Sequence, residues 1–442
     1  MSFDRRRFLS ASAAALAAPY VRTSHAAGSL SVGFWDHWVP RANDGLTKLC
    51  NEWAAKEKVD LKIDYITSQG NKLLLTITAE AQAKAGHDVI SVYSWYAAGH
   101  GPLLEPVDDV VQPLIAQYGN PPGAIEYLGK QNGHWIGVPA TCGSQMKGPC
   151  ARVDLFKQYA GIDLTKMYPP GAPADRQLTD KWTWDAFLVA AQKCHKAGFP
   201  FGIGMGETAD SVDSAGAIFA AHGAHLVDAQ GNITVNSDAT RQALEYCKKL
   251  VQVLPPDVFA WDDASNNKWL IAGKGALIMN PPSAWAVAKR DNPKVAEQLW
   301  TFPAPKGPKG RFQPAGPFYW GIWKFSKNKA AARSLLTYLS QRSSVEQLVT
   351  ASAGYDVPSF PALRDFEIWA EVGPPKGTLY HYPPRGDEIL SISGAPAPVP
   401  VAMQMYTQAT ITKMIAKFTQ SNESMDKVIA WASSELEGFM RA

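Results

Sequence analysis

Apolar residues along the first hundred positions switch between two periods. Residues 30–34 are apolar at every second position, as in a strand with one buried face, and residues 59–65 repeat this alternation. Residues 46–53 and 71–84 instead carry apolar side chains at helical spacing, and residues 88–92 form a short apolar run. The order strand, helix, strand, helix, strand predicts an α/β fold in which a mostly parallel sheet carries helices on both faces.

Later segments continue this alternation. A helical stripe that begins at Trp184 ends at Gly198, a residue type that suits the left-handed position after a helix. Asp238 is placed to cap another helix, and residues 275–280 and 321–323 have the composition of short buried strands. The same architecture is therefore expected over most of the chain.

The C-terminal part begins with a proline-rich stretch, residues 373–400, which predicts a surface loop. Residues 401–418 follow with helical spacing and are expected to form one helix that carries Tyr406. Asn422 or Ser424 is placed to start the last helix.

Ligands of parallel sheets bind beyond the carboxyl ends of the strands, so the composition of the loops there matters. Four such loops, 34–38, 93–96, 281–285 and 317–320, are rich in aromatic residues. Flat rings suit the C–H faces of sugars, and neighbouring Asp, Asn and Gln side chains satisfy hydroxyl groups that lose water. The alternative is that the 15 tryptophans fill hydrophobic cores. The shared position of the four loops favours a binding site.

The N-terminus has the three parts of a secretory signal. Consecutive arginines from Arg5 precede an apolar stretch, residues 8–21, and small residues follow at Ser24 and Ala26. The stretch is too short to span a membrane, and the arginines before it are typical of twin-arginine export. We therefore expect a signal peptide at residues 1–26, cleavage near Ala26, and a soluble periplasmic product without a lipid anchor, since no cysteine follows the cut.

Charge and length exclude several classes of protein. The formal net charge is +3, and loss of the arginine-rich leader leaves a nearly neutral chain. A neutral protein has no electrostatic attraction to nucleic acid or to an anionic membrane surface. The 442 residues also exceed the size at which a single hydrophobic core stops growing, about 250–300 residues, so two lobes are expected.

The sequence contains no motif for a cofactor or for catalysis. The five cysteines lack the spacing of a zinc, haem or redox site, although Cys142 and Cys150 are close enough in sequence to be bridged in an oxidising compartment. Metalloprotease, nucleophile-elbow and phosphate-loop patterns are missing. Adjacent carboxylates such as Asp262 and Asp263 would suit a glycosidase, but adjacent loop carboxylates are usually solvated. We predict a protein without cofactor, metal or enzymatic activity; an exported carbohydrate-active enzyme is the alternative.

Several short motifs occur in an order that resembles one protein family. The motifs are NGHWIGVP at 132–139, RVDLF at 152–156, WTWDAF at 182–187, GKGALI at 273–278 and GYDVP at 354–358. In this order and spacing they resemble the family 1 extracellular solute-binding proteins of ABC importers, the group that includes maltose-binding protein. The resemblance covers nearly the whole chain after the leader.

The resemblance implies two α/β lobes with a ligand cleft between them. Three chain crossings would join the lobes, near 139–147, 301–316 and 354–358. The first lobe would comprise residues 28–140 plus 315–354, and the second would comprise residues 141–314 plus 355–442. Solute would bind in the cleft, hinge closure would bury it, and the closed monomer would dock on permease subunits in the inner membrane. A sensory protein of the same fold is a further alternative.

Positions in the matching loops give the candidate ligand-binding residues. The candidates are Trp35, Asp36, Trp38, Gln69, Trp95, Tyr96, Gln145, Lys147, Ser283, Trp285, Tyr319, Trp320, Tyr355 and Asp356. The helix that carries Tyr406 is also expected to border the cleft. Aromatic loops without clustered arginines favour a sugar, an oligosaccharide or a polyol over a phosphorylated solute.

Overall fold

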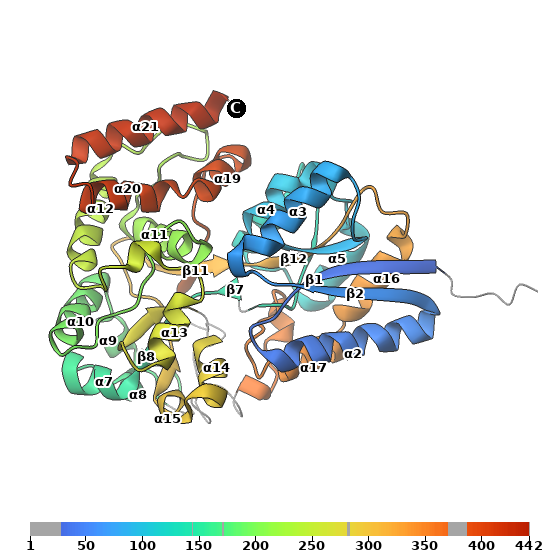
Figure 1. Ribbon diagram of the computed structural model, residues 1–442, viewed down its shortest axis with the longest axis horizontal. Helices are drawn as coiled ribbons and strands as arrows, with labels where there is room; N and C mark the ends of the chain where they lie inside the picture. Colours follow the sequence, from blue (N-terminus) through green and yellow to red (C-terminus); the bar gives the residue numbers. More distant parts are fainter. Residues whose placement is uncertain (1–27, 144, 170–171, 281–282, 370–386, 442) are drawn as a thin grey trace, which may run out of the picture.

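The chain folds into two lobes that lie side by side (Figure 1). The computed structural model describes residues 28–143, 145–169, 172–280, 283–369 and 387–441. The predicted signal peptide at residues 1–26 lies outside the described residues. We call the lobe that contains the N-terminal strand the first lobe, and the lobe that carries the C-terminal helix the second lobe.

A five-stranded sheet forms the centre of the first lobe. Its strand order is β2-β1-β3-β12-β6. The strands are β1 (Gly28–Trp35), β2 (Val59–Ile66), β3 (Val89–Tyr93), β6 (Val138–Pro139) and β12 (Phe318–Ile322). β1 pairs in parallel with β2 and with β3, and β12 runs antiparallel between β3 and β6. The predicted β-α-β-α-β order is confirmed, and the late strand β12 brings residues from beyond position 310 beside β3.

Helices cover both faces of this sheet, as the sequence predicts (Figure 1). They are α2 (Pro40–Glu57), α3 (Lys72–Ala83), α4 (Trp95–His100), α5 (Asp108–Tyr118), α6 (Gly123–Gly129), α16 (Lys329–Leu339) and α17 (Arg342–Ala351). The apolar positions that predict α2, including Leu49, Cys50 and Trp53, are buried against the sheet.

One strand of this sheet differs from its prediction. Residues 317–320 are expected to be a loop before a strand at 321–323, but β12 already begins at Phe318. Tyr319 and Trp320 are therefore central strand residues, hydrogen-bonded to β3 on one side and β6 on the other. A run of consecutive apolar residues does not show where a fully buried strand starts, because it lacks the alternation that marks a half-buried one.

The second lobe combines two small sheets with a larger number of helices. One sheet has the order β10-β8-β9 and the other β13-β11-β7. The strands are β7 (Gln145–Met146), β8 (Pro149–Arg152), β9 (Leu277–Met279), β10 (Leu299–Thr301), β11 (Arg311–Gly316) and β13 (Glu388–Ser391). The helices include α7 (Val153–Leu155), α8 (Leu164–Met167), α9 (Arg176–Thr179), α10 (Trp184–Lys196), α11 (Ala209–His222), α12 (Asp238–Val251), α13 (Ser265–Ile271), α14 (Ser283–Asp291), α15 (Pro293–Ala296), α19 (Val399–Thr407), α20 (Thr410–Thr419) and α21 (Met425–Arg441).

Side-chain caps fix where the central helices of this lobe begin. The α11 N-cap is Thr208, whose side chain accepts a hydrogen bond from the Ser211 backbone N–H. The cap of α12 is Ser237 rather than the predicted Asp238, because the Ser237 hydroxyl accepts from Thr240 N–H while Asp238 is the first helical residue. Gly198 adopts the expected left-handed conformation after α10, with φ of +86°.

The C-terminal part also departs from its prediction. The expected helix at 401–418 is two helices, α19 and α20, because Ala409 between them has a left-handed backbone with φ of 53°. The predicted surface loop at 373–400 lies partly outside the described residues, and its described part forms β13, paired with β11, followed by a buried segment at Ile392 and Ser393. The described part of this proline-rich stretch is ordered because β13 pairs with β11, a strand that is distant in sequence.

The two cysteines that are close enough in sequence to be bridged are free thiols. Cys142 belongs to the main apolar core, whereas Cys150 on β8 belongs to a separate small cluster with Leu270 and Ile278. The two side chains therefore face different parts of the protein.

Candidate functional site

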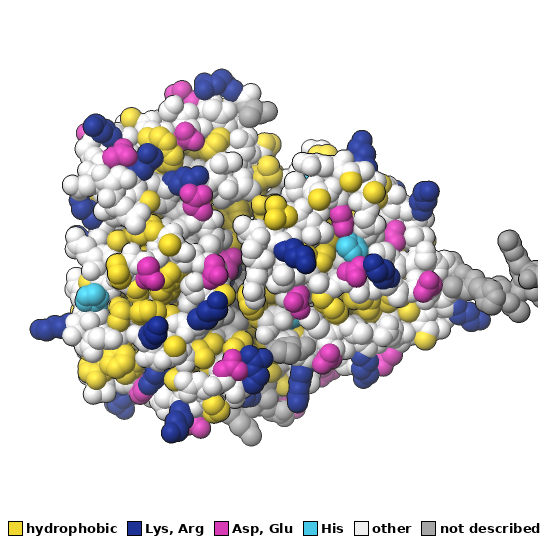
Figure 2. Space-filling model, in the orientation of Figure 1, with side chains coloured by type: hydrophobic (Ala, Val, Ile, Leu, Met, Phe, Trp, Pro, Cys, Tyr) yellow, Lys and Arg dark blue, Asp and Glu magenta, His cyan; other side chains and the backbone are white. Residues whose placement is uncertain are grey.

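A cavity of about 180 Å³ lies between the lobes and is lined by residues of both. The surface is hollowed between the lobes on the face seen in Figure 2. The lining residues from the first lobe are Trp35, Trp38, Ser68, Asn71, Leu73, Leu74, Tyr93, Tyr96 and Phe318. Those from the second lobe are Lys147, Glu207, Ala209, Asp210, Val212, Asp263, Asn280, Gly316, Tyr406 and Thr407, and Gly143 and Tyr355 lie on connecting segments. We call this cavity the cleft.

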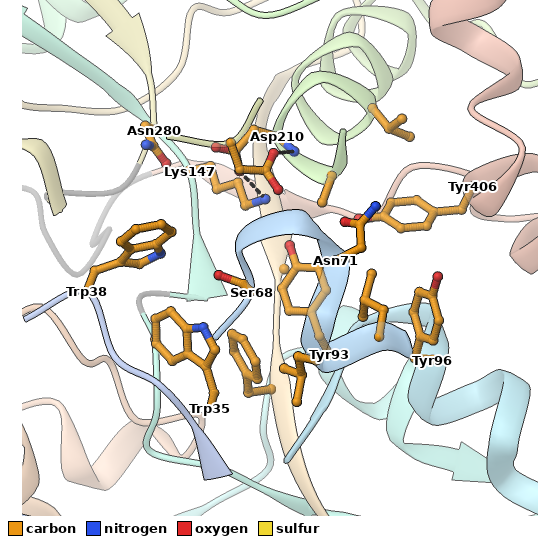
Figure 3. Close-up of a pocket in the computed structure, with 18 of the residues that line it drawn as sticks. Trp35, Trp38, Ser68, Asn71, Tyr93, Tyr96, Lys147, Asp210, Asn280 and Tyr406 are labelled. Carbon is orange, nitrogen blue, oxygen red and sulfur yellow. Dashed lines mark hydrogen bonds and ion pairs between the residues drawn. The ribbon is translucent and has the colours of Figure 1, made fainter. Parts of the chain in front are cut away.

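The first-lobe wall of the cleft is aromatic. Trp35, the last residue of β1, stacks on Phe318 with ring centroids 4.8 Å apart and an interplanar angle of 25°. Tyr93, the last residue of β3, lies 4.9 Å from the same Phe318 ring. The parallel strands β1 and β3 end at the same edge of the sheet, so their terminal rings form one surface. Trp38 and Tyr96 extend it on either side (Figure 3).

The second-lobe wall carries charge. Lys147 Nζ lies 2.6 Å from Asp210 Oδ1 and 2.8 Å from Asp213 Oδ2, and the three side chains are mostly or fully buried. Both carboxylates lie on the first turns of α11, behind the Thr208 cap. The Tyr93 hydroxyl donates to Asp213 Oδ2 at 3.1 Å, so one hydrogen bond joins the two walls.

This close approach of Tyr93 depends on a glycine. A Cβ atom at Gly316, on β11, would overlap the Tyr93 hydroxyl. Gly316 lines the cleft and pairs with Gln145 on β7. Any side chain at this position would push Tyr93 away from Asp213.

The charge states of this cluster follow from its geometry. Burial by itself would lower the pKa of Lys147, but Asp210 and Asp213 outweigh it and hold the pKa well above its ordinary value. Burial raises the pKa of Asp213, against the opposing effect of Lys147. Burial and then the nearby Asp210 raise the pKa of Asp263 to about 6. Lys147 is therefore a permanent ammonium group that can donate hydrogen bonds but cannot act as a general base or nucleophile.

A chain of amide groups supports the same wall. Asn280 Nδ2 donates to Asn267 Oδ1 at 2.8 Å and to Asn266 Oδ1 at 3.2 Å, and Asn266 Nδ2 donates to Asp210 Oδ2 at 3.1 Å. These asparagines are nearly inaccessible to solvent. Asn280 thus presents a fixed amide to the cleft (Figure 3) while the chain holds Asp210 in place.

Three buried polar atoms around the cleft have no hydrogen-bond partner among the described residues. They are Trp35 Nε1 on the aromatic wall, and Asp213 Oδ1 and the Tyr406 hydroxyl on the opposite wall. Buried polar groups are hydrogen-bonded in the great majority of cases, so each exception calls for an explanation. Trp35 and Tyr406 belong to the cleft lining, so a polar molecule that reaches them between the walls would supply the missing partner.

The structure brings five of the fourteen candidate residues together at the cleft. These are Trp35, Trp38, Tyr96, Lys147 and Tyr355. Tyr406, expected at its border, also lines it. The backbone of Gln145 is part of β7, and its side chain is not described.

The other eight candidates lie away from the lining. Asp36 and Gln69 are exposed side chains beside the cleft, and Asp36 accepts a hydrogen bond from Asn43. Asp356 is buried and accepts from the Gly143 backbone N–H at 2.6 Å, with His37 Nε2 at 2.8 Å. Asp356 therefore ties two connecting segments together instead of facing the cleft.

The remaining five are core residues. Trp95 donates from Nε1 to the Ser393 carbonyl at 2.8 Å, and the Tyr319 hydroxyl donates to the Ile125 carbonyl at 2.6 Å. Trp320 packs against Phe34 inside the first lobe. Ser283 and Trp285 are buried at the start of α14, where the Ser283 hydroxyl bonds Asn267. Each ring follows or forms a strand. Trp95 is buried between the lobes, against Ser393 and Tyr406, and the other rings are buried inside one lobe.

The acidic residues that line the cleft are not among the candidates predicted from the sequence. Asp263 is expected to be a solvated loop carboxylate, but it lines the cleft and accepts from the Asp210 backbone N–H at 3.2 Å. Asp210 has a local signal, because Thr208 and Ser211 form a recognisable helix start around it. Nothing local indicates that this helix start faces the aromatic wall.

Within the described residues, no helix is long and apolar enough to cross a membrane. In the same part of the chain, no three His, Cys, Asp or Glu side chains are grouped in a way that would hold a metal ion.

Comparison with known proteins agrees with this architecture. The sequence profile of the family described as bacterial extracellular solute-binding protein matches residues 40–344, more than half of the chain. A probable ABC transporter-binding protein of Deinococcus radiodurans is 24% identical over 387 residues, which is 83% of this chain and 83% of that protein.

Solved structures of binding proteins share the fold. Maltose-bound MalE3 of T. maritima superposes with a TM-score of 0.72 at 17% identity, over 93% of this chain and 99% of that one. An ABC transporter solute-binding protein of Agrobacterium radiobacter in complex with ribitol has a TM-score of 0.68 at 17% identity, over 94% and 99%. These neighbours are binding proteins, and their likeness shows the two-lobe fold of that class.

Proposed function

Since the chain belongs to the family of bacterial extracellular solute-binding proteins, we propose that it is the periplasmic receptor of an ABC importer for a small hydroxylated solute. The observation that carries the proposal is the two-walled cleft. Its stacking surface lies on one lobe and its charged and amide groups lie on the other. A solute that contacts both walls links the lobes, as hinge closure requires.

The chemistry of the walls fits a sugar or a polyol. Trp35, Trp38 and Tyr96 offer flat apolar faces to C–H groups. Asp210, Asn280 and Lys147 offer acceptors and donors for hydroxyl groups. The fold neighbours bound to maltose and to ribitol support this class of solute.

The proposal includes the mechanism of transport. In the predicted division the first lobe comprises residues 28–140 plus 315–354 and the second comprises 141–314 plus 355–442. Residues 360–365 depart from it, because they pack on α5 and α17 of the first lobe. The lobes close on the solute as a monomer. The closed form delivers the solute to permease subunits and catalyses no reaction. Residues 1–26 direct export by the twin-arginine route, and the neutral mature chain has no affinity for nucleic acid.

A titration of the purified protein without residues 1–26 tests this proposal. Tryptophan fluorescence and calorimetry would follow the addition of glucose, maltose, ribitol and mannitol, and small-angle scattering would follow the radius of gyration. We expect saturable binding of one hydroxylated class together with a contraction of the molecule. The absence of a response to every sugar and polyol, or turnover of one into a product, would overturn the proposal.

Two tyrosines provide a matched pair of variants. The Tyr406→Phe change removes a cleft hydroxyl that has no partner in the described residues, whereas Tyr319→Phe removes a core hydroxyl bonded to Ile125. We expect Tyr406→Phe to weaken binding by up to about tenfold without loss of stability, and Tyr319→Phe to reduce stability without changing affinity.

A further inference from the structure

The charges that line the cleft are unbalanced. Glu207, Asp210 and Asp263 contribute carboxylates, and Lys147 is the only basic residue among the described residues that line the cleft. Asp213 lies directly behind Lys147 and adds a further carboxylate. The second-lobe wall is therefore strongly acidic, although the whole chain is nearly neutral.

The single lysine is fully occupied. Its ammonium group contacts both Asp210 and Asp213, within 2.8 Å of each. Glu207 has its own cation at the surface, with Lys413 Nζ 3.5 Å from its carboxylate. Asp263 forms no ion pair within the described part of the chain and accepts a hydrogen bond from the Asp210 backbone N–H. The Asp210 carboxylate is near enough for its charge to contribute to the raised pKa of Asp263, because like charges disfavour each other's ionisation.

One orphaned atom on the lining indicates a partner in the cleft. Trp35 Nε1, on a residue only 3% exposed, is a donor without a hydrogen-bond partner among the described residues and points from the opposite wall toward Ser68 (Figure 3). A solute that accepts a hydrogen bond at this end matches it. Asp213 does not line the cleft, and its unpaired Oδ1 adds negative charge behind Lys147.

The aromatic wall tolerates a cation. The faces of tryptophan and tyrosine rings attract positive charge, more strongly where water is excluded. Lys147 Nζ already lies 5.4 Å from the centre of the Tyr93 ring. The first lobe contributes no charged side chain to the described lining.

We propose that the solute carries a protonated amino group that binds against Asp210 and Asp263, while its hydroxylated carbon frame lies on the aromatic wall. The solute is thus an amino sugar or an amino polyol. This inference rests on the proposed function and specifies its solute.

A neutral sugar is the competing ligand, since carboxylates also accept hydrogen bonds from hydroxyl groups. Because Glu207 is paired with Lys413, a neutral ligand would leave the carboxyl groups of Asp210, Asp213 and Asp263 against the single ammonium of Lys147 in the closed cleft. An ammonium group balances this excess, and it relieves the repulsion between Asp210 and Asp263 that contributes to the raised pKa of Asp263.

Calorimetry with matched ligand pairs tests the inference. Glucosamine is compared with glucose, and 1-amino-1-deoxysorbitol with sorbitol, at pH 7.5 and low salt; N-acetylglucosamine serves as an uncharged amide control. At least one amine should bind about tenfold or more tightly than its neutral partner and its acetylated form. The preference should shrink in 0.5 M NaCl because screening weakens charge pairs.

A pair of neighbouring variants locates the amino group. We expect Asp263→Asn to weaken amine binding by about tenfold or more and to change neutral-sugar binding by less than about threefold. Asp262→Asn, the same chemical change at an exposed neighbour, should leave both unchanged.

The outcomes separate the inference from the proposed function. Equal or tighter binding of the neutral partner overturns the amine inference and leaves the receptor function intact. Amine preference that survives Asp263→Asn overturns the placement on this wall. If no sugar, polyol or amine derivative binds, the proposed function itself fails.

Discussion

The two walls of the cleft are built from different chemistry by different structural means. The first-lobe wall consists of rings at the ends of parallel strands, where β1 and β3 finish with Trp35 and Tyr93. The second-lobe wall consists of carboxylates and amides at the start of α11 and in the loops beside it. The carboxyl ends of the strands therefore supply the stacking surface, and the capped N-terminus of a helix supplies the polar surface.

This separation explains how solute recognition can be coupled to closure of the two lobes. Neither wall alone satisfies a solute with both apolar and polar faces, so the full set of contacts exists only when the lobes are close. Tyr93 already joins the two walls, through its hydrogen bond to Asp213 and through the Lys147 ammonium group over its ring. Four predictions test the distinction between the walls, and between each wall and the core behind it.

The largest effect is expected from breaking the charged wall. Lys147→Met leaves Asp210 and Asp213 buried without their cation, which should lower the free energy of unfolding by about 3–5 kcal/mol and abolish solute binding. Denaturant titration measures the change. Lys413→Met, which removes only the surface partner of Glu207, should cost less than about 1 kcal/mol. Adding Asp213→Asn to Lys147→Met should recover part of the loss; a double variant as unstable as the single one would contradict this account.

The next prediction separates cleft rings from core rings. Trp95→Ala removes a fully buried ring and its hydrogen bond to Ser393, and should cost about 3–5 kcal/mol of stability. Trp38→Ala, at a half-buried position of the cleft, should cost less than about 1 kcal/mol but weaken solute binding by about tenfold or more. Parallel melting and titration experiments measure both quantities. Comparable losses of affinity in the two variants would show that the distinction between core and cleft is wrong.

A pH-dependent effect is expected at Asp263, whose folded-state pKa is about 6 against about 4 in an unfolded chain. Between these values the folded state binds the proton that the unfolded state has lost, so stability falls as pH rises from about 4 to about 6. The loss amounts to at most about 3 kcal/mol and persists above pH 6. Asp263→Asn should therefore raise the melting temperature at pH 7.5 and leave it unchanged at pH 4. A uniform shift at both pH values would contradict the assignment.

The smallest effect is expected just outside the cleft. Gln69 is exposed in the short segment Gln69–Asn71 before α3 and does not line the cavity. Gln69→Ala should leave the free energy of unfolding unchanged and should change the affinity for solute by less than about twofold. A larger loss of affinity in calorimetry would show that the closed cleft extends beyond the present lining.

Local sequence patterns predicted most of the fold correctly. The alternation in β1 and β2 and the helical stripe of α2 arise because each element buries one face, which is a property of nearby residues. The start of β12 and the split between α19 and α20 were missed, because a fully buried strand has no alternation and a left-handed Ala409 leaves no sign in the composition.

The candidate site residues also separate into those that the sequence predicted correctly and those that it did not. Trp35 and Trp38 were predicted because they follow a strand in a parallel sheet, where binding loops occur. Trp95, Tyr319 and Trp320 satisfy similar rules and are core residues, since neighbouring side chains along a strand or a turn point in opposite directions.

The sequence by itself therefore determined the class of fold, the order of its elements and the presence of aromatic loops, because periodicity and composition record which faces are buried. Only the tertiary structure decided which rings face the cleft and that Lys147, Asp210, Asp213 and Asp263 form one cluster opposite them. Trp35 meets Phe318, and Tyr93 meets Asp213, across long separations in the chain. Contacts of this kind depend on how distant segments of the chain pack, within one lobe for Trp35 and Phe318 and between the lobes for Tyr93 and Asp213. Short-range patterns carry no information about that packing.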